Sequence, residues 1–93
     1  MPSGVKLIPK PASLHSDEYK RFLEHLRAVR LAAGMTQQQI ADQLNKPQSY
    51  VSKCQSGERR MDIVEIHAFC VAMNKPVDEF VREWAIIVKR PKR

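Results

Sequence analysis

The sequence is short and lacks any long apolar segment. Its 93 residues contain no apolar run near the roughly 18 residues of a membrane-spanning helix. The opening residues, MPSGVKLIPKP, also lack the long apolar core of a signal peptide. This length suits one domain with one core, not a catalytic domain with a separate cofactor fold. We therefore expect a single-domain cytoplasmic protein without a membrane partner.

Residues that could carry catalysis or hold a metal are few. The two cysteines, Cys54 and Cys70, fall on predicted helix faces, and the cytoplasm would keep both reduced. Packing explains them better than a metal site of Cys54, His67 and Cys70, which has three ligands and no C-x-x-C pair. His15 and His25 fit surface or boundary positions. Without a paired catalytic constellation, the sequence predicts neither an enzyme nor a cofactor.

Charge, in contrast, is plentiful and unbalanced. Sixteen lysines and arginines face ten aspartates and glutamates, which gives a formal net charge of +6. Such an excess is typical of a surface that meets a polyanion. Nucleic acid fits this charge, and so would an acidic protein partner or an anionic lipid.

The residues TQQQIADQL predict a short helix that begins near Gln37. Thr36 is a suitable N-cap, and Gln39 can reach back to the free backbone N–H of the cap, which is the capping-box pattern. Asn45 fits the end of this helix because asparagine tolerates the left-handed conformation. The helix has a buried apolar stripe, formed by Ile40, Ala41 and Leu44.

A second helix follows almost at once, from Gln48 to about Ser56. Pro47 suits its first position, where the missing N–H costs nothing. Val51 and Cys54 fall together on one side. The outward side carries hydrogen-bonding groups suited to the major groove, where glutamine can pair with adenine and lysine with guanine. The candidate base-reading residues are Gln48, Ser49, Ser52 and Lys53, with Tyr50 on the flank.

Together, TQQQIADQL and PQSYVSKCQSGERR resemble the Cro/CI-type (XRE-like) helix-turn-helix of phage repressors and bacterial transcription regulators. The resemblance runs from about Phe22 to MNKPVDEFV, roughly two thirds of the chain. It implies an all-α fold, a compact five-helix bundle of the lambda-repressor-like DNA-binding type, in which helices two and three form the helix-turn-helix. It is specific for the family and uninformative about the target.

The remaining helices follow from caps and apolar stripes. Ser16 can cap the first helix and Gly34 can end it, whereas Asp62 with Glu65 suits the start of the fourth, about Ile63 to Met73. Pro76 starts the fifth. The predicted core stripes are Tyr19, Phe22, Leu23, Leu26, Val29 and Ala33 in the first helix, Ile66, Phe69, Cys70 and Met73 in the fourth, and Val77, Phe80, Val81 and Trp84 in the fifth.

The sequence departs from the family pattern at one polar pair. In the family, an arginine at the position of Arg30 pairs with a glutamate at the position of Gln55. A neutral amide still accepts a hydrogen bond, but the charge-assisted contribution is lost. Arg30 is therefore expected either to keep this partner or to face a phosphate or solvent.

Four residues are predicted to contact DNA phosphates. Thr36 and Gln37 stand at a helix N-terminus, whose backbone donors favour an anion. Arg59 and Arg60 follow the reading helix, in a loop that the resemblance places near the sugar-phosphate backbone. Such contacts would fix register, not sequence preference. The alternative for both arginines is exposed, solubilising charge.

The chain divides into three predicted parts. Residues 1–16 read as a flexible basic arm, although such arms can enter the minor groove, and Val5, Leu7 and Ile8 also fit a short strand. Residues 17–84 are the helix-turn-helix domain. Residues 85–93 extend the last helix and end in a basic tail, which either adds nonspecific DNA affinity or is simply solvated.

The stretch WAIIV, from Trp84 to Val88, is more apolar than a small closed domain requires. Trp84, Ile87 and Val88 could form a dimer interface, or the helix could pack along its own domain. The leading hypothesis is a sequence-specific double-stranded DNA-binding regulator, a repressor that binds an inverted-repeat operator as a homodimer. The alternatives are an antitoxin that regulates its own promoter and binds a toxin through WAIIV, and a protein-binding module that kept the fold.

Overall fold

The computed structural model describes residues 16–89 of the chain, and across them the backbone forms five helices and no strand. The expected all-α five-helix architecture is confirmed. Residues 1–15 of the predicted basic arm and residues 90–93 of the tail lie outside the described residues. The three-part division of the chain remains a prediction. The helices are α1 (Asp17–Ala32), α2 (Gln37–Leu44), α3 (Gln48–Ser56), α4 (Ile63–Ala72) and α5 (Val77–Lys89).

Three helices begin where their capping residues predict. The Ser16 hydroxyl accepts a hydrogen bond from a backbone N–H of the first turn of α1, at 3.1 Å. Thr36 with Gln39 and Asp62 with Glu65 both form complete capping boxes, in which each side chain bonds the backbone of the other residue. These bonds satisfy N–H groups that have no partner within the helix.

The turn between α2 and α3 depends on Asn45. Its φ of 59° lies in the left-handed region, which asparagine visits more easily than most residues. Pro47 is extended, with ψ 153°, and precedes α3 instead of forming its first residue as predicted. At the end of α3, Gly57 has φ 87°, and a Cβ there would stand 3.0 Å from Leu23. Both facts favour glycine at this position.

The core confirms most of the predicted apolar stripes and corrects two positions. Ala33 is exposed because it lies one residue beyond the end of α1. Val81 is 39% exposed because it borders an open groove between α1, α4 and α5. The side chains that are almost completely buried come from all five helices and include Leu26, Ile40, Val51, Cys54, Phe69, Cys70 and Phe80.

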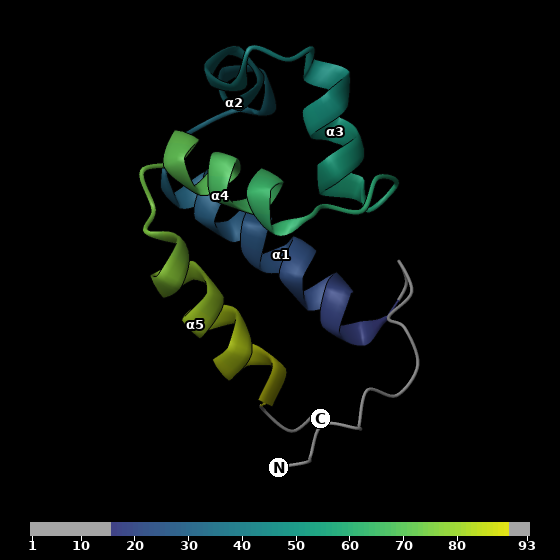
Figure 1. Cartoon of the computed structure of the whole chain (residues 1–93), viewed down its shortest axis with the longest axis vertical. Helices are drawn as coiled ribbons and strands as arrows, with labels where there is room; N and C mark the ends of the chain where they lie inside the picture. Colours follow the sequence, from purple (N-terminus) through teal and green to yellow (C-terminus); the bar gives the residue numbers. More distant parts are fainter. Residues whose placement is uncertain (1–15, 90–93) are drawn as a thin grey trace.

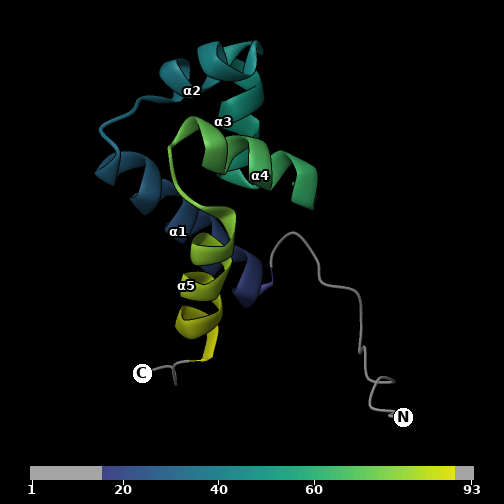
Figure 2. The same cartoon turned by 60° about the vertical axis from the view of Figure 1, so that its left-hand side comes forward.

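The helices are arranged around α1, which runs through the molecule (Figures 1 and 2). The pair α2–α3 occupies one end, and α4 lies against α2 and α5. Alongside α1, α5 extends toward the opposite end. Within residues 16–89, no helix is both long and apolar enough to cross a membrane. This arrangement leaves one side of α3 open at the α2–α3 end.

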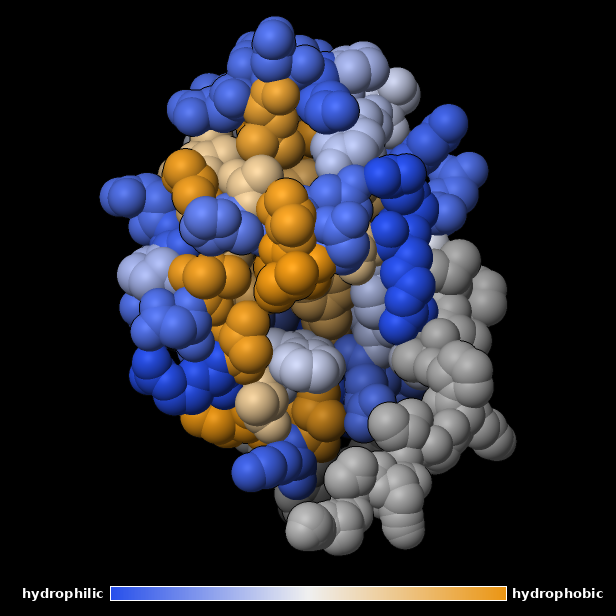
Figure 3. All heavy atoms as spheres, in the orientation of Figure 1, coloured by the Kyte–Doolittle hydropathy of each residue, from blue (hydrophilic) through white to orange (hydrophobic). Residues whose placement is uncertain are grey.

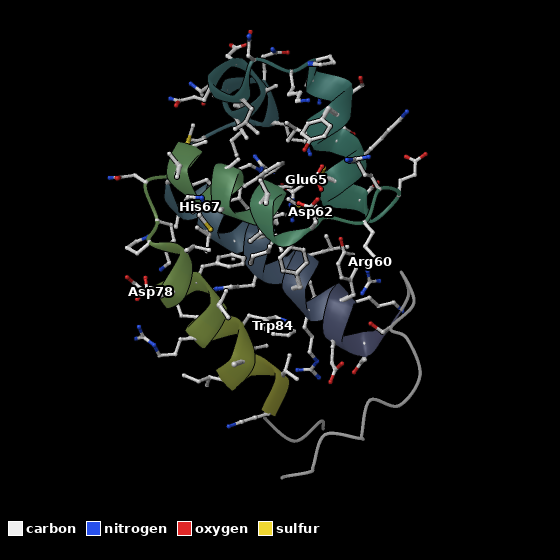
Figure 4. All side chains as sticks on the ribbon, in the orientation of Figure 1. Arg60, Asp62, Glu65, His67, Asp78 and Trp84 are labelled. Atoms are coloured by element: carbon white, nitrogen blue, oxygen red, sulfur yellow. The ribbon has the colours of Figure 1, made fainter. Side chains whose placement is uncertain are left out.

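The apolar end of α5 packs on its own domain. The Trp84 indole N–H donates to the Glu18 carbonyl at 3.1 Å, and Arg21 donates to the Ile87 carbonyl at 3.2 Å. Figure 4 shows Trp84 between α5 and α1. Ile87 and Val88 are half-buried. Of the two roles expected for this stretch, packing along α1 is therefore seen directly.

Candidate nucleic-acid interface

One side of α3 anchors the helix and the other is open. Val51 and Cys54 are fully buried, so the opposite side cannot turn inward without exposing them to water. Gln48, Ser49 and Lys53 are exposed, and Ser52 is half-buried. Four of the five predicted base-reading residues therefore lie on one open side of α3, which could enter the major groove of DNA.

The N-termini of α2 and α3 are joined by their first residues. The Gln48 side-chain N–H donates to the Gln37 side-chain oxygen at 2.7 Å. An amide carries two N–H groups, so Gln48 keeps one donor and its acceptor for an adenine edge. Gln37 keeps its own NH₂ group. A predicted base contact and a predicted phosphate contact are thereby held side by side, which the sequence did not reveal.

Tyr50 lies on the flank of α3 that faces α4. Its hydroxyl donates to a Glu65 carboxylate oxygen at 3.0 Å, and its ring lies 6.3 Å from the Phe69 ring. Burial, followed by this contact with Glu65, raises the pKa of Tyr50 to about 12. The hydroxyl is therefore occupied within the protein, and only the ring remains for a thymine methyl or a sugar.

The two arginines after α3 have different partners. Arg59 donates to Glu65 through Nε at 3.2 Å and Nη2 at 2.5 Å, and this arginine holds the pKa of Glu65 below its usual value. A phosphate contact by Arg59 would share the guanidinium with that carboxylate. The Arg60 guanidinium lies 4.5 Å from the centre of the Tyr19 ring, near the start of α1 (Figure 4).

Arg30 turns inward and does not face phosphate or solvent. It is 8% exposed, its Nε donates to the Gln55 side-chain oxygen at 3.1 Å, and its Nη1 donates to the Met35 carbonyl at 2.8 Å. Burial lowers the pKa of Arg30, and repulsion from Arg27 lowers it further. The family pairing is therefore kept with a neutral partner, and a backbone carbonyl that no sequence pattern indicated provides a second acceptor.

The cysteines do not assemble a metal site with His67. Cys54 and Cys70 are buried free thiols, whereas His67 is exposed on α4 (Figure 4). Burial raises the pKa of the Cys70 thiol to about 11, which disfavours the thiolate that a metal requires. In the described part of the chain, no three His, Cys, Asp or Glu side chains are grouped to hold a metal ion.

Comparison with known proteins agrees with this geometry. A family model described as a helix-turn-helix domain matches residues 21–82. A solved structure of an XRE-family like protein from Pseudomonas syringae pv. tomato is 34% identical, with a TM-score of 0.73; the match covers 80% of this chain and 92% of that one. The chain belongs to the XRE-like helix-turn-helix family.

The family assignment fixes the general activity. XRE-like proteins are DNA-binding regulators and not typically enzymes, so this chain is a DNA-binding regulator in general terms. Its helix-turn-helix consists of α2 and α3, as expected. No curated protein matches the sequence.

Proposed function

We propose that this XRE-like protein is a sequence-specific transcriptional regulator, a repressor that reads the major groove with α3. One observation carries the proposal: Val51 and Cys54 anchor α3 in the core while Gln48, Ser49 and Lys53 stay exposed together. A helix held in this way can present side chains to base edges without losing its packing. Its outward surface also carries no carboxylate to repel DNA.

The proposed contacts divide into reading and anchoring groups. Gln48 and Lys53 have the chemistry to distinguish adenine and guanine, and Ser49 and Ser52 add shorter hydrogen-bonding groups. Tyr50 adds its ring, since its hydroxyl is bonded to Glu65. The proposed phosphate contacts, which fix the register, are Thr36, Gln37, Arg59 and Arg60.

We propose that the regulator acts as a homodimer on an inverted repeat, with half-sites about 34 Å apart. Trp84, Ile87 and Val88 are already half-buried, so the proposed dimer surface of α5 also uses exposed neighbours. Ile86 is 53% exposed, and Val81 borders a groove of about 340 Å³. Figure 3 shows apolar side chains gathered over α4 and α5. A second subunit would remove this surface from water.

The decisive test is selection of preferred sequences from a random duplex pool. The proposal expects an inverted repeat whose half-sites are one helical turn apart, bound with an affinity that falls as salt rises. Equal binding to all recovered duplexes would contradict sequence-specific reading. A single, asymmetric half-site would leave reading intact and contradict the homodimer.

The same apolar surface supports an antitoxin as the second candidate. In that case a toxin would cover the α5 surface, while α3 would regulate the promoter of the pair. A small toxin reading frame beside the gene is required, so the neighbouring genes decide between the two functions.

A module that only binds protein would behave differently from both. For such a module, reversing the charge of Lys53 or Arg60 would leave DNA occupancy unchanged.

A further inference from the structure

A single carboxylate of α4 contacts both α3 and the loop that follows it. Glu65 lies in the first turn of α4, and its side chain is 16% exposed (Figure 4). Its Oε2 accepts hydrogen bonds from Nε and Nη2 of Arg59, at 3.2 and 2.5 Å. The same oxygen accepts from the Tyr50 hydroxyl at 3.0 Å. Glu65 therefore joins α4 to two residues of the proposed DNA interface, although it belongs to neither the reading nor the anchoring group.

The Glu65 carboxylate is itself held in one orientation. Its Oε1 accepts from the Asp62 backbone N–H at 2.9 Å, and its own backbone N–H donates to the Asp62 carboxylate at 2.8 Å. This capping box uses Oε1 and leaves Oε2 for the two side chains outside α4. The bond from Arg59 and then the bond from the Asp62 backbone lower the pKa of Glu65. The carboxylate is therefore charged at neutral pH, and it is fixed before any partner binds.

The contact with Glu65 orders Arg59 without using all of its donors. A guanidinium has five N–H groups in a planar fork, and Glu65 takes only the edge formed by Nε and Nη2. The Arg59 side chain remains 50% exposed, and its Cζ lies 5.5 Å from the centre of the Tyr50 ring. An arginine without such partners gives up rotamer freedom when it binds, and this loss weakens binding. For Arg59, much of this loss has already occurred in the free protein.

We propose that Glu65 is a positioning residue for DNA binding, which holds the Arg59 guanidinium in one orientation before the duplex arrives. The inference rests on the proposed DNA-binding function and adds α4 to the elements that control it. Glu65 does not contact DNA and acts only through Arg59. Its negative charge alone would repel DNA. Ordering of Arg59 and the charge of Glu65 therefore change DNA affinity in opposite directions.

The sign of the Glu65→Gln effect tests this proposal. Affinity is measured for the selected operator and for an unrelated duplex at about 0.15 M salt, where charges are screened beyond about 8 Å. Because Arg59 loses its ordering partner, binding to both duplexes should weaken by about two- to tenfold. The removal of a negative charge from the protein would by itself strengthen binding. Stronger binding by Glu65→Gln would overturn the proposal.

Two further variants separate ordering from charge. Arg59→Gln removes the residue through which Glu65 acts, so adding Glu65→Gln to this variant should strengthen binding, since only the loss of negative charge remains. Glu58→Gln is the matched control. Glu58 is exposed and directly precedes Arg59, which nevertheless pairs with Glu65. Glu58→Gln therefore removes the same charge from the same loop without removing the ordering contact, and it should strengthen binding to both duplexes.

Folding is followed separately from binding. Glu65→Gln keeps a side chain that can cap α4, because Gln39 closes the same capping box at the start of α2. The unfolding temperature shows whether each variant is fully folded at the temperature of the binding assay. If Glu65 only stabilised the fold, Glu65→Gln would weaken binding by the same factor with Arg59 and with Arg59→Gln. Equal factors in these two backgrounds would overturn the proposal.

The order of Arg59 in the free protein gives a readout that does not need DNA. In nuclear magnetic resonance, the Nε–H of Arg59 should exchange slowly with water in the wild type and faster in Glu65→Gln. Equal exchange in the two proteins would overturn the proposal. If the wild type shows no operator preference, sequence-specific reading fails instead, and the effect of Glu65→Gln is still measured on the unrelated duplex.

Discussion

The two ends of this molecule use polar and apolar side chains in opposite ways. At the α2–α3 end, Val51 and Cys54 are buried and the exposed side of α3 is polar. At the α5 end, polar groups tie the helix to α1, as Trp84 does through Glu18, while Ile86 remains exposed. The first end suits a hydrated, charged partner such as DNA, and the second suits an apolar protein surface.

Truncating a buried residue of α2, the helix that packs against α3, should have the largest effect on this contrast between the two ends. Ile40 is fully buried, and Ile40→Ala should cost about 2 to 5 kcal/mol of unfolding free energy through lost burial and a cavity. Chemical denaturation measures this loss. Binding measured on the folded fraction alone should stay near that of wild type, so a defect that exceeds the unfolded fraction would mean that Ile40 also controls how α3 is oriented.

Removing one reading group should leave the scaffold intact. Gln48→Ala should cost about 1 to 3 kcal/mol at the preferred operator and relax the preference at one base pair. Competition with operators altered at single base pairs measures this effect. Gln37→Ala is the control, because it removes the same inter-helix hydrogen bond without a base contact and should weaken all sequences equally. Identical behaviour of the two variants would refute the division into reading and anchoring groups.

Tyr50 lies on the flank of α3, between the exposed polar side of this helix and its buried apolar side. Tyr50→Phe removes the hydrogen bond to Glu65 and should cost about 1 kcal/mol of stability, with base preference unchanged. The pKa of Tyr50 is raised from 10.0 to about 12, so its neutral form is favoured in the folded state. Its contribution to stability is full below pH 10 and is lost as the pH rises toward 12.

The pH dependence separates this tyrosine from the other groups that titrate in the same range. Denaturation of wild type and Tyr50→Phe between pH 9 and 12 should show the two stabilities converging as the pH rises. A stability difference that stays constant over this range would contradict the role of the hydroxyl.

A substitution on the exposed surface of α5 is expected to change the unfolding free energy least. Its main effect should be on the dissociation constant of the dimer. Ile86→Glu changes an exposed position and should alter monomer stability by about 0.5 kcal/mol or less. A buried isoleucine contributes about 1.5 to 3 kcal/mol, so the dimer dissociation constant should rise about tenfold or more. Analytical ultracentrifugation measures this change. Leu31→Glu, at an apolar position that is also 53% exposed, should leave the dimer intact.

Helix starts and turns were predictable because each depends on neighbours in the sequence. The capping bonds of Ser16, Thr36 and Asp62 all join residues three apart. Asn45 and Gly57 adopt left-handed conformations, which asparagine tolerates and glycine adopts because it has no Cβ. The apolar periodicity placed Val51 and Cys54 inward, and therefore also indicated which side of α3 faces outward.

Two residues predicted to lie in the core are exposed. In one case the helix has already ended, and in the other no neighbouring helix covers the side chain. Val81 follows the periodicity of α5 but borders a groove, which only the spacing of α1, α4 and α5 reveals. Ala33 continues the stripe of α1 in sequence, but the helix has already ended. Periodicity gives the direction of a side chain within a helix, and it does not say whether another helix covers it.

By itself, the sequence determined the helices, the turn of the helix-turn-helix and the family, because caps, left-handed residues and apolar stripes act over a few residues. Tertiary structure alone decided the long-range partners. Gln37 meets Gln48 across 11 residues, Arg30 meets Gln55 across 25, and Trp84 meets Glu18 across 66. Such contacts depend on how the helices cross, and they determine which polar groups remain for DNA.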